Sequence, residues 1–499
     1  MIKIDELKKA TNLEVYEGSL IEAGEATYFL ARRGTEKLVG CVGKGAIKGS
    51  KVGSMDGKDM TVGPTDHANA AAIRKALLWT APRCIGLATS VGLGDRLGLA
   101  TPGHVRAVRG TGLAPYFAQQ SIREMTRTQR TPEQVMDCAT WGVFQEGYRD
   151  GFGSDGDHVQ RIEDLDSLVA SGFTMFTIDP GPHVVNQADA MNGEELSGNY
   201  ANLDWKTFDT SPQALQDLYS HGKFKLADGS FISLDEEAFL RAAVKYGNAI
   251  CQVVKMHRRL QKICKYPFEL EASVDETESV TSPAEHFFFA AELKRLGVRW
   301  VSMAPRLVGR FEKGVDYIGD LDVFRASFAQ HVAVMRTLGP YKISIHSGSD
   351  KFSIYPIVAE LTGGLVHLKT AGTSYLEAVR AISRIDPALF REIYDFARGR
   401  YETDKASYHV SADMSKVPPV SKLSDQQLPA SLDQFDTRQM LHVTFGSVLT
   451  ADGGEKFRKR FYAALEKQEE VHYEVLARHI GRHVAPFAKN RQTGRAGRQ

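Results

Sequence analysis

The stretch YKISIHSGSDKFSIYPIVAELTGGLVHLKT, residues 341 to 370, holds one complete unit of the pattern that decides the fold. An apolar run (341–348) leads through a small polar cluster and a helix-like segment into a second apolar run (364–370). A strand that passes through a helix into another strand favours a right-handed βαβ unit with parallel strands. The same order recurs between about residue 83 and residue 375. The other apolar runs are CIGLATSV (84–91), PYFAQQS (115–121), the region around YRDGFGSD (148–155), FTMFTID (173–179), FELEASVDE (268–276) and RWVSMAP (299–305).

Eight such units predict an α/β fold, a closed (β/α)8 barrel of the TIM type, with an open doubly wound sheet as the competing architecture. We expect a small N-terminal α+β segment over residues 1–80 and a catalytic barrel over residues 81–400. The long interval after the fourth strand predicts an insertion at about 185–265. Residues 401–499 are expected to form a C-terminal helical extension, and its basic tail, KNRQTGRAGRQ, has a composition typical of disorder.

The composition favours a cytoplasmic enzyme without nucleic-acid or membrane partners. The 499 residues include 62 basic and 61 acidic side chains, so the net charge of +1 offers no attractive field to a polyanion. No apolar run approaches the roughly 18 residues of a membrane span, and the N-terminus lacks the apolar core of a signal peptide. Five widely spaced cysteines without a CxxC pair indicate reduced thiols. A homo-oligomeric state is left open.

Polar and titratable residues stand at the carboxyl end of nearly every predicted strand, where a parallel barrel gathers its chemistry. In YRDGFGSDGDHV (148–159), three glycines predict a tight backbone path that lets Asp157 and His158 enter the barrel mouth as a base and a ligand. An Asx-rich turn, whose acids bond only to their own backbone, is the alternative. The strand-end groups are Asp95-Arg96, Gln119-Gln120-Ser121, Asp155 to His158, Asp179 to His183, Asp275-Glu276, Pro305-Arg306, His346 to Asp350, and His367 with Lys369.

Histidines at three strand ends predict a metal site formed by His158, His346 and His367. For each of them the alternative is a hydrogen-bonded core histidine, and His183, within a proline turn, is an outside candidate. In FELEASVDE, one strand face carries Glu269, Glu271, Ser273 and Asp275. Acids that face a barrel interior are costly unless they are paired or metal-bound, so this face is predicted to be functional. Glu271, Asp275 and Glu276 are available to complete the coordination sphere.

Arginines near the strand ends are candidates for binding the substrate. Arg96, Arg149 and Arg306 could each clamp a carboxylate or phosphate through the planar guanidinium, or form a structural salt bridge. Gln120, Asp275 and Lys369 complete the predicted substrate-binding set because they stand at strand ends. The glycines of VGLGDRLG (91–98) are spaced GxGxxxG, which argues against a dinucleotide loop.

Several long blocks resemble the tagaturonate epimerase family. They are GLGDRLGLATPGH (92–104), FAQQSIREMTRT (117–128), ATWGVFQEGYRDGFGSDGDH (139–158), FTIDPGPHV (176–184), HSGSDKFSIYP (346–356) and HLKTAGTSYLEA (367–378). The resemblance implies an enzyme that depends on a divalent metal cation (Zn, Mn, Ni or Co) and interconverts D-tagaturonate and D-fructuronate, with relatives that act on fructose and tagatose. It further implies Asp157 as proton acceptor, Glu271 as proton donor, and His158 and His346 as metal ligands.

The two uronates differ at a hydroxyl-bearing carbon two bonds from the ketone, where simple deprotonation cannot invert the centre. A retro-aldol route and a transient oxidation by nicotinamide are the two chemical solutions, and the missing dinucleotide motif favours the first. A metal-dependent sugar isomerase or aldolase on the same barrel, and a non-catalytic sugar-binding protein, are the alternative functions.

Overall fold

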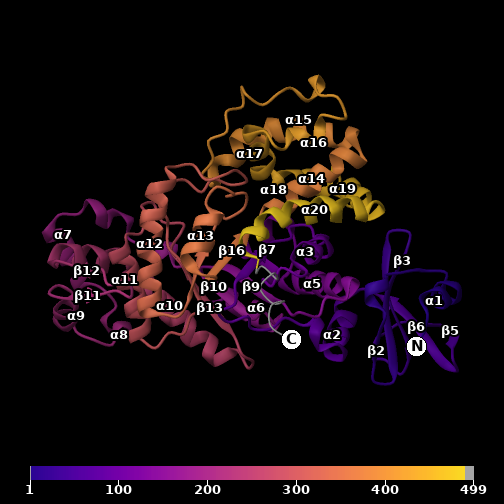
Figure 1. The fold of residues 1–499 in the computed structure, drawn as a ribbon, viewed down its shortest axis with the longest axis horizontal. Coiled ribbons are helices and arrows are strands. Elements are labelled where there is room, and N and C mark those ends of the chain that lie inside the picture. The colour runs from indigo at the N-terminus through magenta and orange to yellow at the C-terminus, as the bar shows by residue number, and fades with distance from the viewer. Residues whose placement is uncertain (1, 489–499) are drawn as a thin grey trace, which may run out of the picture.

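A closed barrel of eight parallel strands forms the centre of the molecule (Figure 1). The computed structural model describes residues 2–488. Its barrel strands are β7 (Ser90–Leu93), β8 (Ala114–Ser121), β9 (Gly153–Val159), β10 (Met175–Ile178), β13 (Glu269–Ser273), β14 (Ser302–Ala304), β15 (Lys342–Ile345) and β16 (Val366–Thr370). Pairing of β16 with β7 and of β9 with β10 closes the ring. The predicted (β/α)8 barrel is confirmed, and the open sheet is excluded.

Two of the predicted strand runs are shifted toward the carboxyl side. Only the end of the run at 84–91 belongs to β7, because Gly86 has a left-handed φ of 65° that interrupts an extended chain. The backbone N–H of Gly86 instead donates to the side chain of Glu269 at the start of β13, so this loop crosses the amino end of the barrel. The glycine-rich run around residue 150 is shifted in the same way, since β9 begins only at Gly153.

Helices follow the barrel strands along the chain and pack around them. They are α3 (Thr101–Val108), α4 (Ile122–Thr128), α5 (Pro132–Glu146), α6 (Asp164–Ala170), α10 (Glu236–Ile263), α11 (Pro283–Arg295), α12 (Leu321–Leu338), α13 (Tyr355–Thr362) and α14 (Thr373–Ile385). The starts of α5 and α11 show why these segments are helical. Thr131 and Ser282 each accept the backbone N–H of the third helical residue, whose Gln or Glu side chain accepts in return from the cap backbone.

Additional elements flank the barrel on several sides. The N-terminal part forms an antiparallel sheet of β1 (Glu14–Val15), β2 (Ile21–Ala23), β3 (Ala26–Arg33), β4 (Glu36–Gly43), β5 (Ser50–Met55) and β6 (Lys58–Pro64), with α1 (Ile4–Thr11) and α2 (His67–Ala76). Between β10 and β13 lie α7 (Gly193–Ala201), α8 (Trp205–Phe208), α9 (Pro212–Tyr219), β11 (Lys223–Lys225) and β12 (Phe231–Ser233), followed by α10. Figure 1 places these two groups at opposite ends of the molecule. The domain boundaries expected at residues 80 and 400 stay predictions.

The C-terminal part continues from α14 as a helical layer beside the barrel (Figure 1). It comprises α15 (Pro387–Asp404), α16 (Leu428–Ser431), α17 (Phe435–Val443), α18 (Phe445–Thr450), α19 (Arg458–Lys467) and α20 (Glu469–Val484). The helix α20 packs against α3 and α14, and its Ile480 and Val484 join the apolar core of the barrel. The tail at 489–499 lies outside the described residues. Within the described range, no helix combines the length and apolarity needed to cross a bilayer.

Candidate active site

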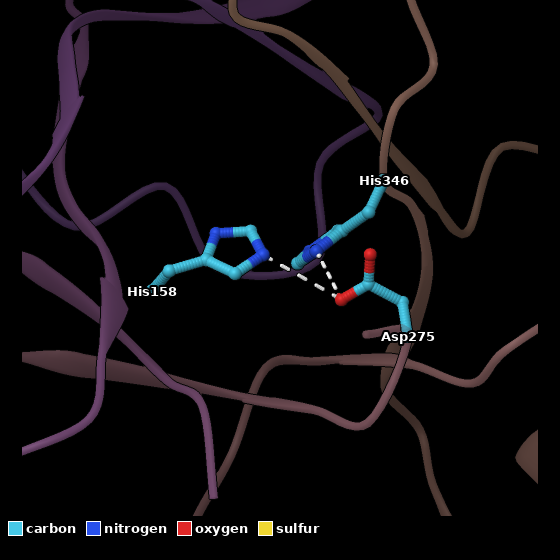
Figure 2. Close-up of side chains that lie close together, drawn as sticks. All are labelled: His158, Asp275 and His346. Carbon is cyan, nitrogen blue, oxygen red and sulfur yellow. Dashed lines mark ion pairs between the residues drawn. The ribbon is translucent and has the colours of Figure 1, made fainter. Parts of the chain in front are cut away.

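Two histidines and one carboxylate from three different barrel strands meet at the carboxyl end of the barrel (Figure 2). His158 Nε2 lies 3.6 Å from Asp275 Oδ1, and His346 Nδ1 lies 2.9 Å from the same oxygen. The centroids of the two imidazole rings are 4.8 Å apart. His158 belongs to β9, His346 directly follows β15, and Asp275 lies two residues beyond the end of β13. Residues that are 188 positions apart in the chain therefore face a common point.

An irregularity in β9 explains how both Asp157 and His158 reach this mouth. Gly156 is paired with Phe176 of β10, but Val159 is paired with Ile178, so two residues of β9 oppose Thr177 alone. Such a bulge interrupts strand alternation and redirects a side chain. His158 adopts a left-handed φ of 51°, a conformation costly for a residue with a Cβ. Gly153 and Gly156 lie within β9, and Gly151 precedes it with a left-handed φ of 83°. Asp157 and His158 therefore reach the barrel mouth from a bulged strand and not from an Asx-rich turn.

A second group of side chains surrounds the ammonium of Lys369 on β16. Its Nζ lies 2.9 Å from Asp155, 2.7 Å from Asp157 and 2.8 Å from Glu271. Thr177 accepts a hydrogen bond of 2.6 Å from the same ammonium. Asp157 also contacts His158 Nδ1 at 2.8 Å, and Glu271 contacts His346 Nε2 at 2.6 Å. The rings of His158 and His346 are therefore each oriented by one carboxylate that also contacts Lys369.

Opposite charges decide the ionisation of this network. Burial by itself would raise the pKa of Asp157 and of Glu271, but Lys369 and the neighbouring histidines hold both pKa values well below the usual range. Burial would lower the pKa of His158, yet Asp157 and Asp275 raise it well above its usual value. Asp155 differs, because burial outweighs Lys369 and raises its pKa to about 6. Of these three carboxylates, Asp155 holds a proton most readily.

The donor atoms at the mouth suit a metal ion. Among residues 2–488, His158, Asp275 and His346 form one of three groups whose ligand-type atoms all lie within 4.8 Å of one another. His158 Nε2 is buried without a hydrogen-bond partner, and it points toward the Asp275 carboxylate (Figure 2). Two imidazole nitrogens and one carboxylate oxygen form a set that leaves coordination positions open for substrate. A second of these groups consists of His158, Asp179 and Glu276, so the two groups share His158.

A narrow inner cavity of about 50 Å³ lies beside this group. Its lining includes Asp157, His158, His346 and Lys369 from the barrel, together with Arg96 and His442. A wider outer pocket of about 420 Å³ adjoins it and is lined in part by Asp275, Glu276 and Arg306. The outer pocket falls within the size range of small-molecule sites, and it shares His346 with the inner cavity.

The structure brings together most, though not all, of the predicted site residues. Asp157, His158, Glu271, Asp275, His346 and Lys369 form the two connected groups described above. Arg96 lines the inner cavity, and Arg306 lines the outer pocket after β14. Gln120 is buried beside Glu124, to which its Nε2 donates at 3.2 Å, and it is not part of either lining.

Three candidates from the sequence, His367, Arg149 and His183, lie away from the inner cavity. His367 precedes Lys369 by two residues on β16 and sits deeper in the barrel, where its Nδ1 bonds to Ser90 at 2.9 Å. Burial lowers the pKa of His367 well below its usual value, as for a neutral core histidine. Arg149 precedes β9 and is exposed beside Trp79, with the guanidinium 5.5 Å from the ring centroid. His183 is exposed in a short 3-10 turn (Gly181–His183).

Sequence reasoning gave no role to several residues that the structure brings to the site. Asp155 shares strand parity with Asp157, and this pattern could have identified it. Thr177 lies in the apolar run FTMFTID and carries no distinguishing pattern. Lys313 and His442 come from a loop after β14 and from α17, so only tertiary packing reveals them.

Known proteins resemble this chain over nearly its whole length. A family model described as tagaturonate epimerase matches residues 16–487. A tagaturonate/fructuronate epimerase of Thermotoga maritima is 44% identical over 474 residues, which cover 94% of this chain and 96% of that protein. Crystal structures of a fructuronate-tagaturonate epimerase from Cohnella laeviribosi, native and with glycerol, match with a TM-score of 0.90 at 35% identity. Both matches cover 97% of this chain and 98% of the other. Because the family model and the Thermotoga relative both match nearly the whole chain, the chain belongs to the tagaturonate epimerase family.

Proposed function

We propose that this chain interconverts D-tagaturonate and D-fructuronate, and that it does so by breaking and re-forming a carbon–carbon bond. The family match over residues 16–487 supports the reaction. The observation that carries the chemistry is the convergence of a His158–Asp275–His346 group and an acid/base cluster at one cavity. The same reaction on the neutral ketoses fructose and tagatose is an epimerisation at C4.

In ketose numbering, the hydroxyl at C4 loses its proton and the C3–C4 bond breaks. The bond electrons pass to the C1–C3 fragment as an enediolate, and C4 becomes an aldehyde. Rotation of the aldehyde presents its other face, the C3–C4 bond forms again, and the new C4 alkoxide takes up a proton. One proton leaves and one returns, so no oxidant or reductant is consumed.

Asp157 is the proposed proton acceptor. It lines the cavity, and its pKa, which burial would raise, is held low by His158 and Lys369, so the carboxylate is ionised before the reaction. Glu271 is buried below the cavity lining and reaches it through Lys369, which contacts both carboxylates. We propose that the proton returns to the C4 oxygen from this group by way of Lys369. Asp155, with a pKa of about 6, gives the group a further place to store a proton.

His158, Asp275 and His346 are the proposed ligands of a divalent cation. When bound, zinc, manganese, nickel or cobalt would supply a Lewis acid that stabilises negative charge on the oxygen atoms of the substrate. Asp157 and Glu271 orient the two histidine rings from behind through contacts of 2.8 and 2.6 Å.

Product analysis with D-tagaturonate tests the reaction. Epimerisation yields D-fructuronate with the carbonyl in place, whereas a sugar isomerase would yield an aldose and an aldolase would release a three-carbon aldehyde. Accumulation of an aldose or of free three-carbon fragments would contradict the proposal, and so would a lack of any turnover. A stoichiometric, tightly bound nicotinamide in the purified enzyme would favour the oxidation route over bond cleavage.

A further inference from the structure

Arg96 lines the inner cavity and carries a buried guanidinium nitrogen that has no hydrogen-bond partner among residues 2–488. Its side chain is 4% exposed, and its Nη2 and Nε bind Glu124 at 2.6 and 2.8 Å. The guanidinium carbon lies 3.7 Å from the centroid of the Phe445 ring, so the plane of the guanidinium is held in place. Its Nη1 has no hydrogen-bond partner among the described residues. A buried donor left unsatisfied is costly, which indicates that a ligand completes it.

His442 of α17 is a second buried group that faces this cavity. The residue is 2% exposed, and neither ring nitrogen has a hydrogen-bond partner in the described part of the chain. The ring is tightly held, since a Cβ on Gly372 would lie 2.0 Å from its Cε1 and a Cβ on Gly314 would lie 3.3 Å from its Nδ1. Burial, Arg96 and Lys313 lower the pKa of His442 well below its usual value, so the imidazole is neutral and offers one N–H donor.

Lys313 supplies a positive charge that no described carboxylate neutralises at close range. It lines both the inner cavity and the outer pocket, and its Nζ donates to the Ser347 hydroxyl at 2.7 Å. The other cations of the inner cavity are already paired, Arg123 with Glu276 at 3.1 Å and Lys369 with its three carboxylates. Lys313 is therefore the cation left over for an anionic ligand.

We propose that Arg96, Lys313 and His442 form a subsite that binds the carboxylate of the sugar acid. This inference rests on the proposed function, and it extends that function by naming the residues that select an acid over a neutral ketose. A carboxylate accepts several hydrogen bonds and matches the three kinds of donor present, a guanidinium, an ammonium and an imidazole N–H. Two of the three residues lie outside the barrel strands and their immediate ends, on a loop after β14 and on α17.

The subsite has a consequence for the proposed bond cleavage. In ketose numbering the carboxylate is C6 and the ketone is C2, so the acid group stays on the C4–C6 aldehyde fragment after the C3–C4 bond breaks. A carboxylate anchored at Arg96 and Lys313 retains this fragment while C4 turns about the C4–C5 bond. A neutral ketose lacks this anchor, and its fragment is held less firmly.

The Lys313→Met substitution tests the subsite, because it removes the charge from a half-buried residue at nearly constant volume. In the metal-loaded enzyme we expect KM for D-tagaturonate to rise about 10- to 100-fold, the range for losing one charged hydrogen bond. Calorimetric binding of D-galactonate should weaken by a similar factor, and binding of the neutral polyol galactitol should change less than about twofold. Lys313→Arg should restore most of the loss, and His442→Asn should also weaken D-galactonate binding. Lys416→Met, at a side chain that is 68% exposed, is the matched control.

Each outcome separates the subsite from the proposed function. An active enzyme in which Lys313→Met and His442→Asn leave KM and D-galactonate binding unchanged would overturn the subsite alone. The subsite is also overturned if galactitol and D-galactonate lose affinity equally. A wild-type enzyme that binds D-galactonate through Lys313 but does not epimerise D-tagaturonate would overturn the function and leave the subsite standing. A wild-type enzyme that neither binds D-galactonate nor epimerises D-tagaturonate would overturn both the subsite and the function.

Discussion

At the scale of single residues, His158 and His346 differ from His367 in what their ring nitrogens face. The first two share the Asp275 carboxylate, whereas His367 bonds to the Ser90 hydroxyl. We expect His158→Ala and His346→Ala to lose the bound metal and to lower kcat/KM by more than about 100-fold. This exceeds the roughly 10- to 100-fold cost of losing a residue that only orients a ligand.

His367→Gln is the matched control for these two variants. It changes a third histidine, which lies deeper in the barrel on the neighbouring strand β16, and it should leave the metal content of the protein unchanged. Elemental analysis of the three purified variants checks both statements. Full loss of metal in His367→Gln, or full retention in His158→Ala, would contradict the ligand set.

Asp155 makes a prediction about pH and stability. Its folded-state pKa of about 6 lies above the unfolded value near 3.9, so the folded protein binds the extra proton between these values. Stability from this group is therefore present at low pH and is lost as the pH rises from about 4 to about 6. Asp155→Asn removes this titration. Between pH 5 and pH 7, the free energy of unfolding should therefore fall by about 1 kcal/mol less in the variant than in the wild type.

Urea denaturation of both proteins at the two pH values measures this difference. An equal change in the wild type and in Asp155→Asn would show that Asp155 titrates in its ordinary range. The variant should also slow proton return, since it removes one carboxylate from the group around Lys369.

The sequence predicts a site residue where the alternation of side chains along a strand shows which face of the sheet that residue occupies. Alternation places Glu271 and Asp275 on one face of β13, and both lie in the site. The alternation does not show how deep in the barrel a side chain lies. Residues two positions apart on a strand share a face but lie about 6.6 Å apart along the strand. His367 and Lys369 therefore point the same way, yet only Lys369 lines the cavity.

At the scale of elements, the glycines of β9 permit close packing within the barrel. A Cβ on Gly153 would lie 2.4 Å from a ring carbon of Tyr116, whose hydroxyl bonds to Glu269 at 3.0 Å. We expect Gly153→Ala to lower the free energy of unfolding by roughly 1–3 kcal/mol, the usual cost of overpacking a core. Circular dichroism during urea denaturation checks it.

Gly198→Ala in α7 is the control for this substitution. No atom lies within 4 Å of a Cβ built there, and alanine is the better helix former. Stability should rise by about 0.5–1 kcal/mol. Equal effects of the two substitutions would contradict the packing argument for β9.

The elements also show where sequence reasoning reached its limit. The βαβ order is a local pattern, and the structure contains it as expected. The capping boxes at Thr131 and Ser282 are equally local, because each involves residues three positions apart. The bulge at Asp157 and His158 is not local, because it depends on the register between β9 and β10. The sequence GSDGDHV by itself does not show that Asp157 and His158 both lie opposite the single residue Thr177 of β10.

At the scale of the whole molecule, α17 and α20 are tied to the loop that carries His346. Arg438 of α17 binds Asp350 at 3.0 Å and Glu377 at 3.1 Å, and His479 of α20 binds Asp350 at 2.6 Å. These side chains are buried. Removing the arginine takes one charged partner from each carboxylate, and leaves Asp350 with His479 and Glu377 with Arg380. We expect Arg438→Met to destabilise the protein by about 1–3 kcal/mol, the cost of losing buried charged hydrogen bonds.

Arg460→Met is the surface control for this ion pair. Arg460 binds Glu392 at 2.7 Å, but both side chains are close to half exposed, and such pairs contribute about 0–1 kcal/mol. Urea denaturation of the two variants compares them directly. A similar loss in both would mean that the buried network does not hold the C-terminal helices in place. No local pattern in the sequence predicts this network, since its four members come from four separate segments, the loop after β15 and the helices α14, α17 and α20.

Metal analysis combined with D-tagaturonate turnover tests the central claim most directly. If His158, Asp275 and His346 hold a cation that the reaction needs, the purified enzyme contains about one divalent ion per chain. Chelation then removes both the ion and the epimerisation, and adding the ion back restores both. Undiminished turnover by a chain from which every divalent ion has been removed would contradict the account.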